Sequence, residues 1–310
     1  MSLLEQTQKL CNLYKIKPAR SKGQNFLIQA EIYDDIIAAA DLKPDDVILE
    51  VGPGLGFLTA KLALRLRSSR LDFGELSRTE LGTKAGQAGK TGRVIAVELD
   101  DKLAETLKTG LIAKEIKNVE VVNENILDFS IKYLVSSIMG NEKNTKYKIV
   151  ANLPYNITSI FLRKFLEMEN KPELMVLMLQ KEVAERICAK TGKMSLLAVS
   201  VQLYAKPEII RMVGKENFWP EPEVGSAIIK LIVNPPNPLF QGGINEKDFF
   251  RLVKFGFSAK RKMLKNNLAA GFKISQLEAE NKIVQAGFNS KIRAQELSVD
   301  DWFKLLSKFY

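Results

Sequence analysis

The chain of 310 residues contains no histidine and only two cysteines, Cys11 and Cys188. Histidine is the commonest general base and metal ligand, so its absence excludes most hydrolase and dehydrogenase mechanisms. The two cysteines lie far apart and form no CxxC pair, which argues against a disulfide framework or a zinc site. We therefore expect chemistry that depends on amides, carboxylates, lysines or tyrosines, with no bound metal.

Long hydrophobic runs are also absent. No window approaches the roughly 20 apolar residues of a membrane span, and no apolar run typical of a secretory signal follows Met1. We expect a cytoplasmic protein with no membrane partner, and a monomer. The formal net charge of +10 favours a polyanionic partner such as a nucleic acid.

Apolar runs typical of strands alternate with helical patterns between residues 47 and 203. The expected strands are Val47–Val51, Val94–Glu98, Val119–Val122, Ile149–Asn152 and Met175–Leu179, and the expected helices between them cover residues 103–112, 159–166 and 182–189. This alternation predicts an α/β fold with a doubly wound, Rossmann-like parallel sheet and a ligand site at the carboxyl ends of its strands. Two later apolar runs, 207–213 and 225–233, are predicted to complete the sheet as its antiparallel edge.

A proline-rich segment, Asn234–Pro238, separates this pattern from a helical C-terminal part. We predict a main domain over residues 1–238 and a small all-helical domain over residues 239–310. Within the first domain, residues 65–93 and 141–148 are polar or glycine-rich and are expected to form surface insertions. In the second, Ser298 is expected to cap a final helix.

Three glycines, Gly52, Gly54 and Gly56, stand between the first strand and a helical pattern. Their spacing is GxGxG, whereas a dinucleotide-binding turn needs GxGxxG and would have glycine where Phe57 stands. Glu50 would repel a pyrophosphate, but it suits the positively charged sulfonium and amino groups of S-adenosylmethionine. The glycines predict a turn that binds this cofactor; the alternative is a tight turn without a ligand.

Three further side chains are candidates for the same cofactor. Glu98 ends the second strand, where an acidic residue can accept hydrogen bonds from ribose hydroxyls. Asn125 follows the third strand, where an amide could bond the adenine edge. Gly23 permits a turn that can place Asn25 near the ligand.

The segment Asn152-Leu153-Pro154-Tyr155 predicts a site for an amine-bearing base. An exocyclic amine is a poor nucleophile because its lone pair is delocalised into the ring. The Asn152 side-chain oxygen and the Leu153 carbonyl could accept its hydrogens and localise that pair, with Pro154 restricting the backbone. The methylated amine is strongly acidic and loses its proton to water, so no ionised base is needed. The alternative is an ordinary strand exit with a satisfied amide.

Aromatic residues are available to hold a flipped base. Tyr155 offers a ring face for stacking, and Phe218 or Trp219 could close the other side.

These motifs are similar to those of the ribosomal RNA adenine dimethyltransferases, most of all the bacterial small-subunit enzymes. The resemblance covers nearly the whole chain and rests on residues 23–27, 49–59, 152–157, 218–224, 250–257 and 260–268. It implies a class I methyltransferase fold and S-adenosylmethionine as cofactor. It also implies transfer of four methyl groups to N6 of two adjacent adenines in the 3′-terminal hairpin loop of small-subunit (16S) rRNA, during ribosome biogenesis.

The same resemblance implies cofactor contacts from Asn25, Leu27, Gly52, Glu98, Asn125 and Asn152. The chain departs from the family pattern in three places. The family usually has aspartate at position 125 and an apolar residue at position 22, and the long insertion at 65–93 is atypical.

A basic segment between Arg251 and Asn267 has six basic residues and no acidic one. We predict that Lys260, Arg261, Lys262 and Lys265 contact RNA phosphates; the alternative is a solvated helix face.

Two other functions fit parts of this pattern. One is an adenine N6-methyltransferase that acts on large-subunit rRNA and confers antibiotic resistance, against which the C-terminal segment 249–268 argues. The other is a non-catalytic RNA-binding assembly factor on the same fold, against which the intact segment Asn152–Tyr155 argues.

Overall fold

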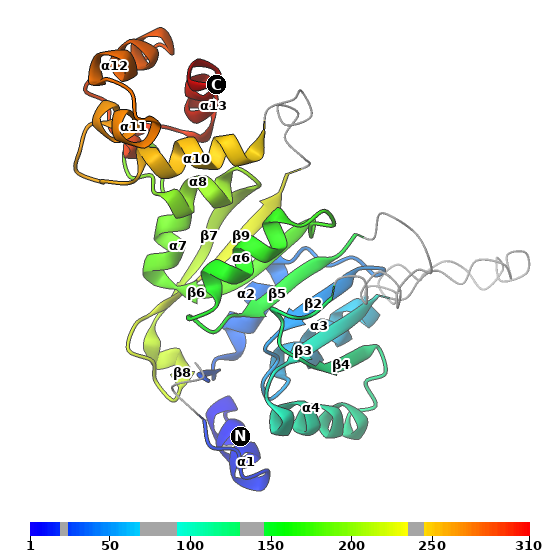
Figure 1. The fold of residues 1–310 in the computed structure, drawn as a ribbon. Coiled ribbons are helices and arrows are strands. Elements are labelled where there is room, and N and C mark those ends of the chain that lie inside the picture. Colours follow the sequence, from blue (N-terminus) through cyan, green and yellow to red (C-terminus); the bar gives the residue numbers. More distant parts are fainter. Residues whose placement is uncertain (19–23, 69–91, 131–145, 235–244) are drawn as a thin grey trace, which may run out of the picture. The chain divides into compact units, whose positions relative to one another are not determined.

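The computed structural model describes residues 1–18, 24–68, 92–130, 146–234 and 245–310 (Figure 1). Residues 69–91 and 141–145, which hold most of the two expected insertions, lie outside these ranges. The strands of the main sheet are β2 (Val47–Val51), β3 (Arg93–Glu98), β4 (Val119–Asn123), β5 (Lys148–Asn152), β6 (Leu174–Gln180), β7 (Ala205–Val213) and β9 (Ser226–Val233). They confirm all seven expected strands to within a few residues.

The described strands form a seven-stranded sheet in the order β4-β3-β2-β5-β6-β9-β7. The first five are parallel, and β9 pairs antiparallel with β6. All residues of β2 are buried, as expected for a parallel strand covered on both faces. β2 lies between β3 and β5, so the chain winds outward in both directions from this point, where ligands of doubly wound sheets bind.

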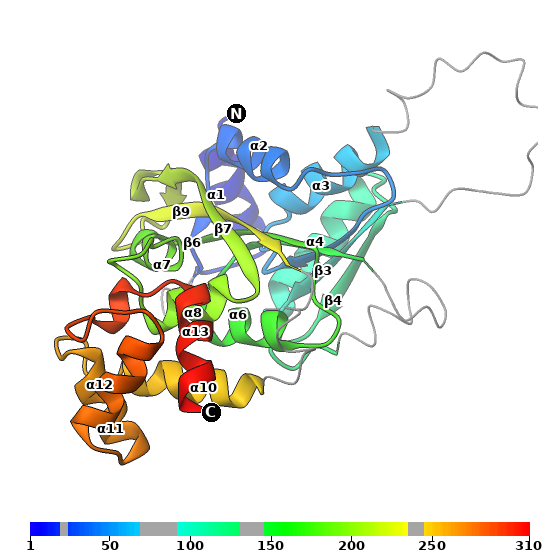
Figure 2. The ribbon, with the colours of Figure 1, turned by 90° about the horizontal axis from the view of Figure 1, so that it is seen from above.

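Helices pack against this sheet, as Figures 1 and 2 show for α3 and α4. The described helices that precede β7 in the chain are α1 (Leu3–Leu13), α2 (Ala30–Ala39), α3 (Phe57–Ser68), α4 (Asp101–Ala113), α6 (Thr158–Glu167), α7 (Lys181–Ile187) and α8 (Leu196–Gln202). They confirm the helices expected over 103–112, 159–166 and 182–189. The main core lies between helices and sheet and includes Ile36, Leu62, Leu107 and Val150.

A second, two-stranded sheet was not predicted. In it β1 (Phe26–Leu27) pairs antiparallel with β8 (Phe218–Trp219), which follows the short 3-10 helix η2 (Lys215–Asn217). The two prolines that follow Trp219 are more typical of a loop between strands than of a strand. The pairing joins two segments that are remote in sequence, and local patterns do not report such contacts.

The C-terminal part is helical. It contains α10 (Glu246–Gly256), α11 (Leu264–Phe272), α12 (Gln276–Gln285), the 3-10 helix η3 (Ala294–Glu296) and α13 (Val299–Phe309). Ser298 caps α13 in a capping box with Asp301, which confirms the expected helix start. Trp302 and Phe249 are fully buried among these helices.

Two compact units divide the chain: Met1–Lys181 with Glu208–Val233, and Glu182–Pro207 with Asn234–Tyr310. The second unit therefore includes α8 and most of α7, which the sequence pattern had placed in the first domain. The domain boundaries at 238 and 239 stay a prediction. None of the described helices is long and apolar enough to cross a membrane.

Candidate functional site

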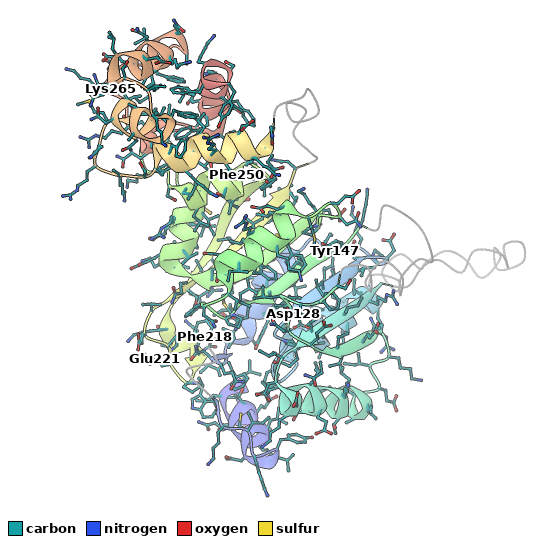
Figure 3. The ribbon with its side chains drawn as sticks, in the orientation of Figure 1. Asp128, Tyr147, Phe218, Glu221, Phe250 and Lys265 are labelled. Carbon is teal, nitrogen blue, oxygen red and sulfur yellow. The ribbon has the colours of Figure 1, made fainter. Side chains whose placement is uncertain are left out.

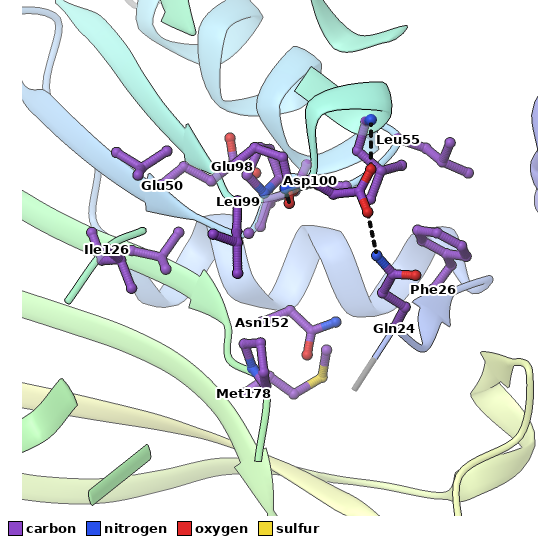
Figure 4. Close-up of a pocket in the computed structure, with 18 of the residues that line it drawn as sticks. Gln24, Phe26, Glu50, Leu55, Glu98, Leu99, Asp100, Ile126, Asn152 and Met178 are labelled. Atoms are coloured by element: carbon purple, nitrogen blue, oxygen red, sulfur yellow. Dashed lines mark hydrogen bonds between the residues drawn. The ribbon is translucent and has the colours of Figure 1, made fainter. Parts of the chain in front are cut away.

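A cavity of about 320 Å³ lies at the carboxyl ends of the parallel strands (Figure 4). This is the position expected from the sheet topology. Its lining comes from the segments after β2, β3, β4 and β5 and from the chain around β1. Among the sequence-predicted residues, the lining includes Asn25, Leu27, Gly52, Gly54, Glu98, Asn125, Asn152 and Pro154.

The glycine turn shapes one wall of the cavity. Gly52, Gly54 and Gly56 have φ angles of +66°, +57° and +79°, which other residues rarely adopt. At Gly54 an added Cβ would lie 3.2 Å from the Phe26 ring. The turn therefore needs glycine for its backbone conformation and, at this position, for space.

Glu98 holds the turn to the end of β3. Its carboxylate oxygens accept hydrogen bonds from the Gly54 N–H and the Asp100 N–H, each at 3.0 Å. Burial raises the pKa of Glu98, and these hydrogen bonds oppose the rise. Each oxygen keeps a second lone pair, so the carboxylate can still accept hydrogen bonds from a ligand. Its bond to a ribose stays a prediction.

Glu50 lies deeper, on β2, and is only 1% exposed. Neither of its carboxylate oxygens has a hydrogen-bond partner among the described residues. Burial raises the pKa of Glu50 to about 8; the nearby Thr59 hydroxyl opposes this rise, and the charge of Glu98 adds to it. An unpaired buried carboxylate is costly, so this side of the cavity favours a cationic ligand or a hydrogen-bond donor.

Asn125 lines the cavity from the loop after β4, but its side chain is engaged within that loop. Its Nδ2 donates to Asp128 Oδ2 at 2.9 Å, and its Oδ1 accepts from the Leu127 N–H at 3.0 Å. One amide hydrogen and one lone pair remain, so contact with adenine is chemically possible and stays a prediction.

Asn152 and Pro154 reach the cavity from the end of β5. Asn152 Nδ2 lies 3.5 Å from the Asn25 carbonyl oxygen, a long hydrogen bond that leaves the side-chain oxygen available. Leu153 is buried, and its N–H donates to the Met178 carbonyl at 3.2 Å, which extends the pairing with β6 beyond the strand. Asn152 and Asn25 thus meet at one end of the cavity, while the Leu153 side chain serves the core.

The residues predicted to stack on the base, Tyr155, Phe218 and Trp219, lie outside the cavity lining. The Tyr155 hydroxyl is hydrogen-bonded to Ser226 Oγ at 2.8 Å, which fixes the ring against β9. Phe218 is 4% exposed and packs in the main core, opposite Leu27 in the β1–β8 pair (Figure 3). Stacking of a base on either ring stays a prediction, and for Phe218 it would require the ring to leave the core.

Lys260, Arg261 and Lys262, in the second unit, are exposed in the turn after α10. Lys265 differs from them, because its ammonium pairs with the Glu280 carboxylate at 2.7 Å and its side chain is only 20% exposed (Figure 3). The first three are well placed to contact an anion. Lys265 would first have to give up its ion pair.

Sequence reasoning missed several lining residues that are neighbours of those it found. Gln24 Nε2 lies 3.5 Å from Asp100 Oδ2 across the cavity mouth, and Leu99 and Ile126 supply apolar surface (Figure 4). Their positions beside Asn25, Glu98 and Asn125 were the only available signal. An unpaired carboxylate, apolar side chains and a glycine turn together suit a ligand that has positive charge, an aromatic base and no phosphate.

A family model described as ribosomal RNA adenine dimethylase matches residues 16–71 and 87–309. The chain is 40% identical to "Ribosomal RNA small subunit methyltransferase A" of Dehalococcoides mccartyi, over 99% of this chain and 94% of that protein. It is 32% identical to the protein of the same name from Alkaliphilus metalliredigens, over 96% of this chain and 94% of that protein.

Two solved structures have a similar fold. One is a dimethyladenosine transferase from Plasmodium falciparum, with a TM-score of 0.69, 24% identity and coverage of 92% of this chain and 97% of that chain. The other is the 23S rRNA methyltransferase ErmE, with a TM-score of 0.66, 24% identity and coverage of 92% and 99%.

Proposed function

This chain belongs to the ribosomal RNA adenine dimethylase family and is an S-adenosylmethionine-dependent methyltransferase, and we propose that its substrate is small-subunit (16S) rRNA. There it dimethylates N6 of two adjacent adenines in the 3′-terminal hairpin loop. Support for the small-subunit substrate comes from the names of relatives that align along nearly the whole chain. The observation that carries the chemistry is the segment Asn152–Tyr155, whose Asn152 and Pro154 line the cavity beside the glycine turn.

The residues around the cavity fit S-adenosylmethionine, which when bound supplies a reactive methyl group on a positively charged sulfur. Burial raises the pKa of Glu50 to about 8, and once its carboxyl is ionised it complements a cationic ligand. Glu98 accepts hydrogen bonds from hydroxyl groups, and the turn at Gly52 and Gly54 lets a ligand approach the backbone closely. Leu99 and Ile126 offer apolar surface to a base.

The part of the site that holds the base to be methylated depends on groups that accept hydrogen bonds. The Asn152 side-chain oxygen and the Leu153 carbonyl accept from the exocyclic amine, and so hold its lone pair toward the methyl donor. Pro154 restricts the backbone that aims the carbonyl. Tyr155, held by Ser226, offers its ring to the flipped base. The proton leaves to water, so the absence of histidine is no obstacle.

The net charge of +10 and the exposed cations at 260–262 supply the attraction to RNA phosphates. The partner is the small ribosomal subunit, which the protein meets as a monomer in the cytoplasm.

A labelled-methyl assay tests this proposal. Under-methylated small subunits and, in parallel, large subunits receive the protein and labelled S-adenosylmethionine, and the modified nucleotides are then mapped. We expect dimethyladenosine at the two adjacent adenines of the small-subunit hairpin loop. Label confined to large subunits would establish the resistance-type activity instead. Tight RNA binding without any label would establish a binding factor.

The substitution Asn152→Ala tests the role of the amide in the same assay. We expect methyl transfer to fall by roughly 100-fold or more, because one of the two acceptors of the amine is lost. Circular dichroism and thermal unfolding should remain close to those of the wild type, since the only hydrogen bond of the side chain within the described residues is the 3.5 Å contact to Asn25. Retained turnover would contradict the role of the amide.

A further inference from the structure

Lys164 of α6 makes an unusual set of contacts with the loop that follows β4. Its ammonium donates to the carbonyl oxygens of Ile126 at 3.1 Å, Leu127 at 2.7 Å and Phe129 at 2.8 Å. A lysine ammonium has three hydrogens to donate, and here all three serve one short loop. Burial lowers the pKa of Lys164, while the nearby carboxylates of Asp128 and Glu124 oppose this change.

This loop is part of the wall of the cavity. Glu124, Asn125 and Ile126 line it, although the loop belongs to no helix or strand. The loop has its own turn, in which the Asp128 N–H and the Phe129 N–H both donate to the Asn125 carbonyl at 2.9 Å. Three of its other carbonyls, those of Ile126, Leu127 and Phe129, converge on the ammonium of Lys164. A single side chain thus supplies most of the hydrogen bonds that fix this stretch of backbone to the rest of the fold.

The lysine comes from a well-anchored helix. α6 begins directly after the acceptor segment Asn152–Ile157, and the Phe161 N–H donates to the Ile157 carbonyl in its first turn. Phe161 and Phe165 are fully buried, with ring centroids 4.6 Å apart. The position of Lys164 is therefore set by the packing of α6 in the core.

We propose that Lys164 is a positioning residue that holds loop 124–129 in the shape needed to line the cofactor pocket. The identity of the cofactor rests on the proposed function; the role of the contact rests on the three hydrogen bonds. Removing the ammonium leaves three carbonyls without their shared donor, so the loop opens toward water and the wall formed by Asn125 and Ile126 is lost. The acceptor side at Asn152 keeps its own support from β6.

Cofactor binding tests the proposal directly, by titration calorimetry with S-adenosylmethionine. For Lys164→Met, which keeps the alkyl stem, we expect the Kd to rise roughly tenfold, the loss expected from charge-assisted hydrogen bonds. Lys164→Arg keeps donors at this position and should restore most of the affinity. Arg163→Met, at the neighbouring position of α6 where the side chain is 72% exposed, is the matched control and should bind like the wild type.

Amide hydrogen exchange gives a second readout that does not depend on activity. In Lys164→Met, peptides that cover residues 124–129 should exchange faster, while peptides from β5 keep their protection. Steady-state kinetics should show a higher KM for the cofactor and an unchanged KM for rRNA.

The proposal is overturned if Lys164→Met folds, loses stability and still binds the cofactor with wild-type affinity, because the lysine would then serve the fold alone. If Lys164→Met does not fold, Lys164→Gln, which retains a neutral donor, is tested by the same criteria. Cofactor binding requires no rRNA, so the result holds even if the small-subunit substrate proves wrong.

Discussion

At the scale of single residues, Glu50 is a buried carboxyl group whose ionisation costs stability. Burial raises the pKa of the Glu50 carboxyl in the folded protein from its ordinary value of 4.5 to about 8, so the folded protein keeps this proton over a pH range in which the unfolded chain loses it. Its contribution to stability is therefore complete below pH 4.5 and is lost as the pH rises through 8. The free energy of unfolding of the cofactor-free protein should therefore fall between pH 4.5 and pH 8.

Glu50→Gln removes this titration. We expect the free energy of unfolding of the variant to exceed that of the wild type by an amount that grows from pH 5 to pH 8, reaching about 1 kcal/mol or more. Urea unfolding at several pH values, without cofactor, measures the difference. The same variant should bind S-adenosylmethionine more weakly, since the complementary charge is gone. The prediction would be contradicted if the free energies of unfolding of the two proteins differed by the same amount at every pH.

The location of a single residue could be predicted from the sequence where its motif stands at the end of a parallel strand. Glu98 and Asn152 end parallel strands, so their arrival at one cavity followed from the sheet topology. Two features could not be foreseen, because both depend on how side chains from separate elements meet: the Glu50 carboxylate has no hydrogen-bond partner in the described part of the chain, and Lys164 makes three bonds. Phe218 was expected beside the ligand, and its ring lies in the core because β8 pairs with β1.

At the scale of elements, the glycine turn between β2 and α3 packs closely against α4. A Cβ at Gly56 would lie 2.3 Å from Leu107 Cδ1 of α4, at a φ of +79°. Gly56→Ala should therefore destabilise the protein by about 2–4 kcal/mol, from left-handed strain and overpacking together.

Gly110→Ala is the matched control for this substitution. Gly110 lies within α4, and an added Cβ would meet nothing within 4 Å. The change should leave stability unchanged or raise it by about 0.5–1 kcal/mol, the helix propensity gained. Thermal or urea unfolding compares both variants with the wild type, and equal effects would refute the packing argument.

The sheet was the most predictable element of the fold. Its buried strands carry runs such as Val47–Val51 that are apolar at nearly every position, and their alternation with helices specifies parallel order. The pairing of β1 with β8 was missed because each strand has only two residues and a periodic pattern needs more. The grouping of α8 with the C-terminal helices was missed because the sequence shows no break before it.

At the scale of the whole molecule, the net charge of +10 should act through a small number of phosphate contacts. Replacing Lys260, Arg261 and Lys262 together by glutamine should weaken RNA binding and reduce the slope of log K against log salt by about 2–3. Lys265→Gln is the contrasting variant: because this lysine pairs with Glu280, we expect little change in slope. Binding assays between 50 and 200 mM salt, as a rough range, give the slopes. An unchanged slope in the triple variant would show that the segment is only solvated surface.

The two-stranded sheet of β1 and β8 also sets an order of events during protein synthesis. Phe26 and Leu27, which line the cavity, find their strand partners only at Trp219 and Phe218. At the roughly 5–20 residues that a ribosome adds per second, β8 is made on the order of ten seconds or more after β1. The nascent chain therefore carries an incomplete cavity wall through most of its translation. Under the proposed function, the new enzyme can hold its methyl donor only after nearly all of its first unit has been made.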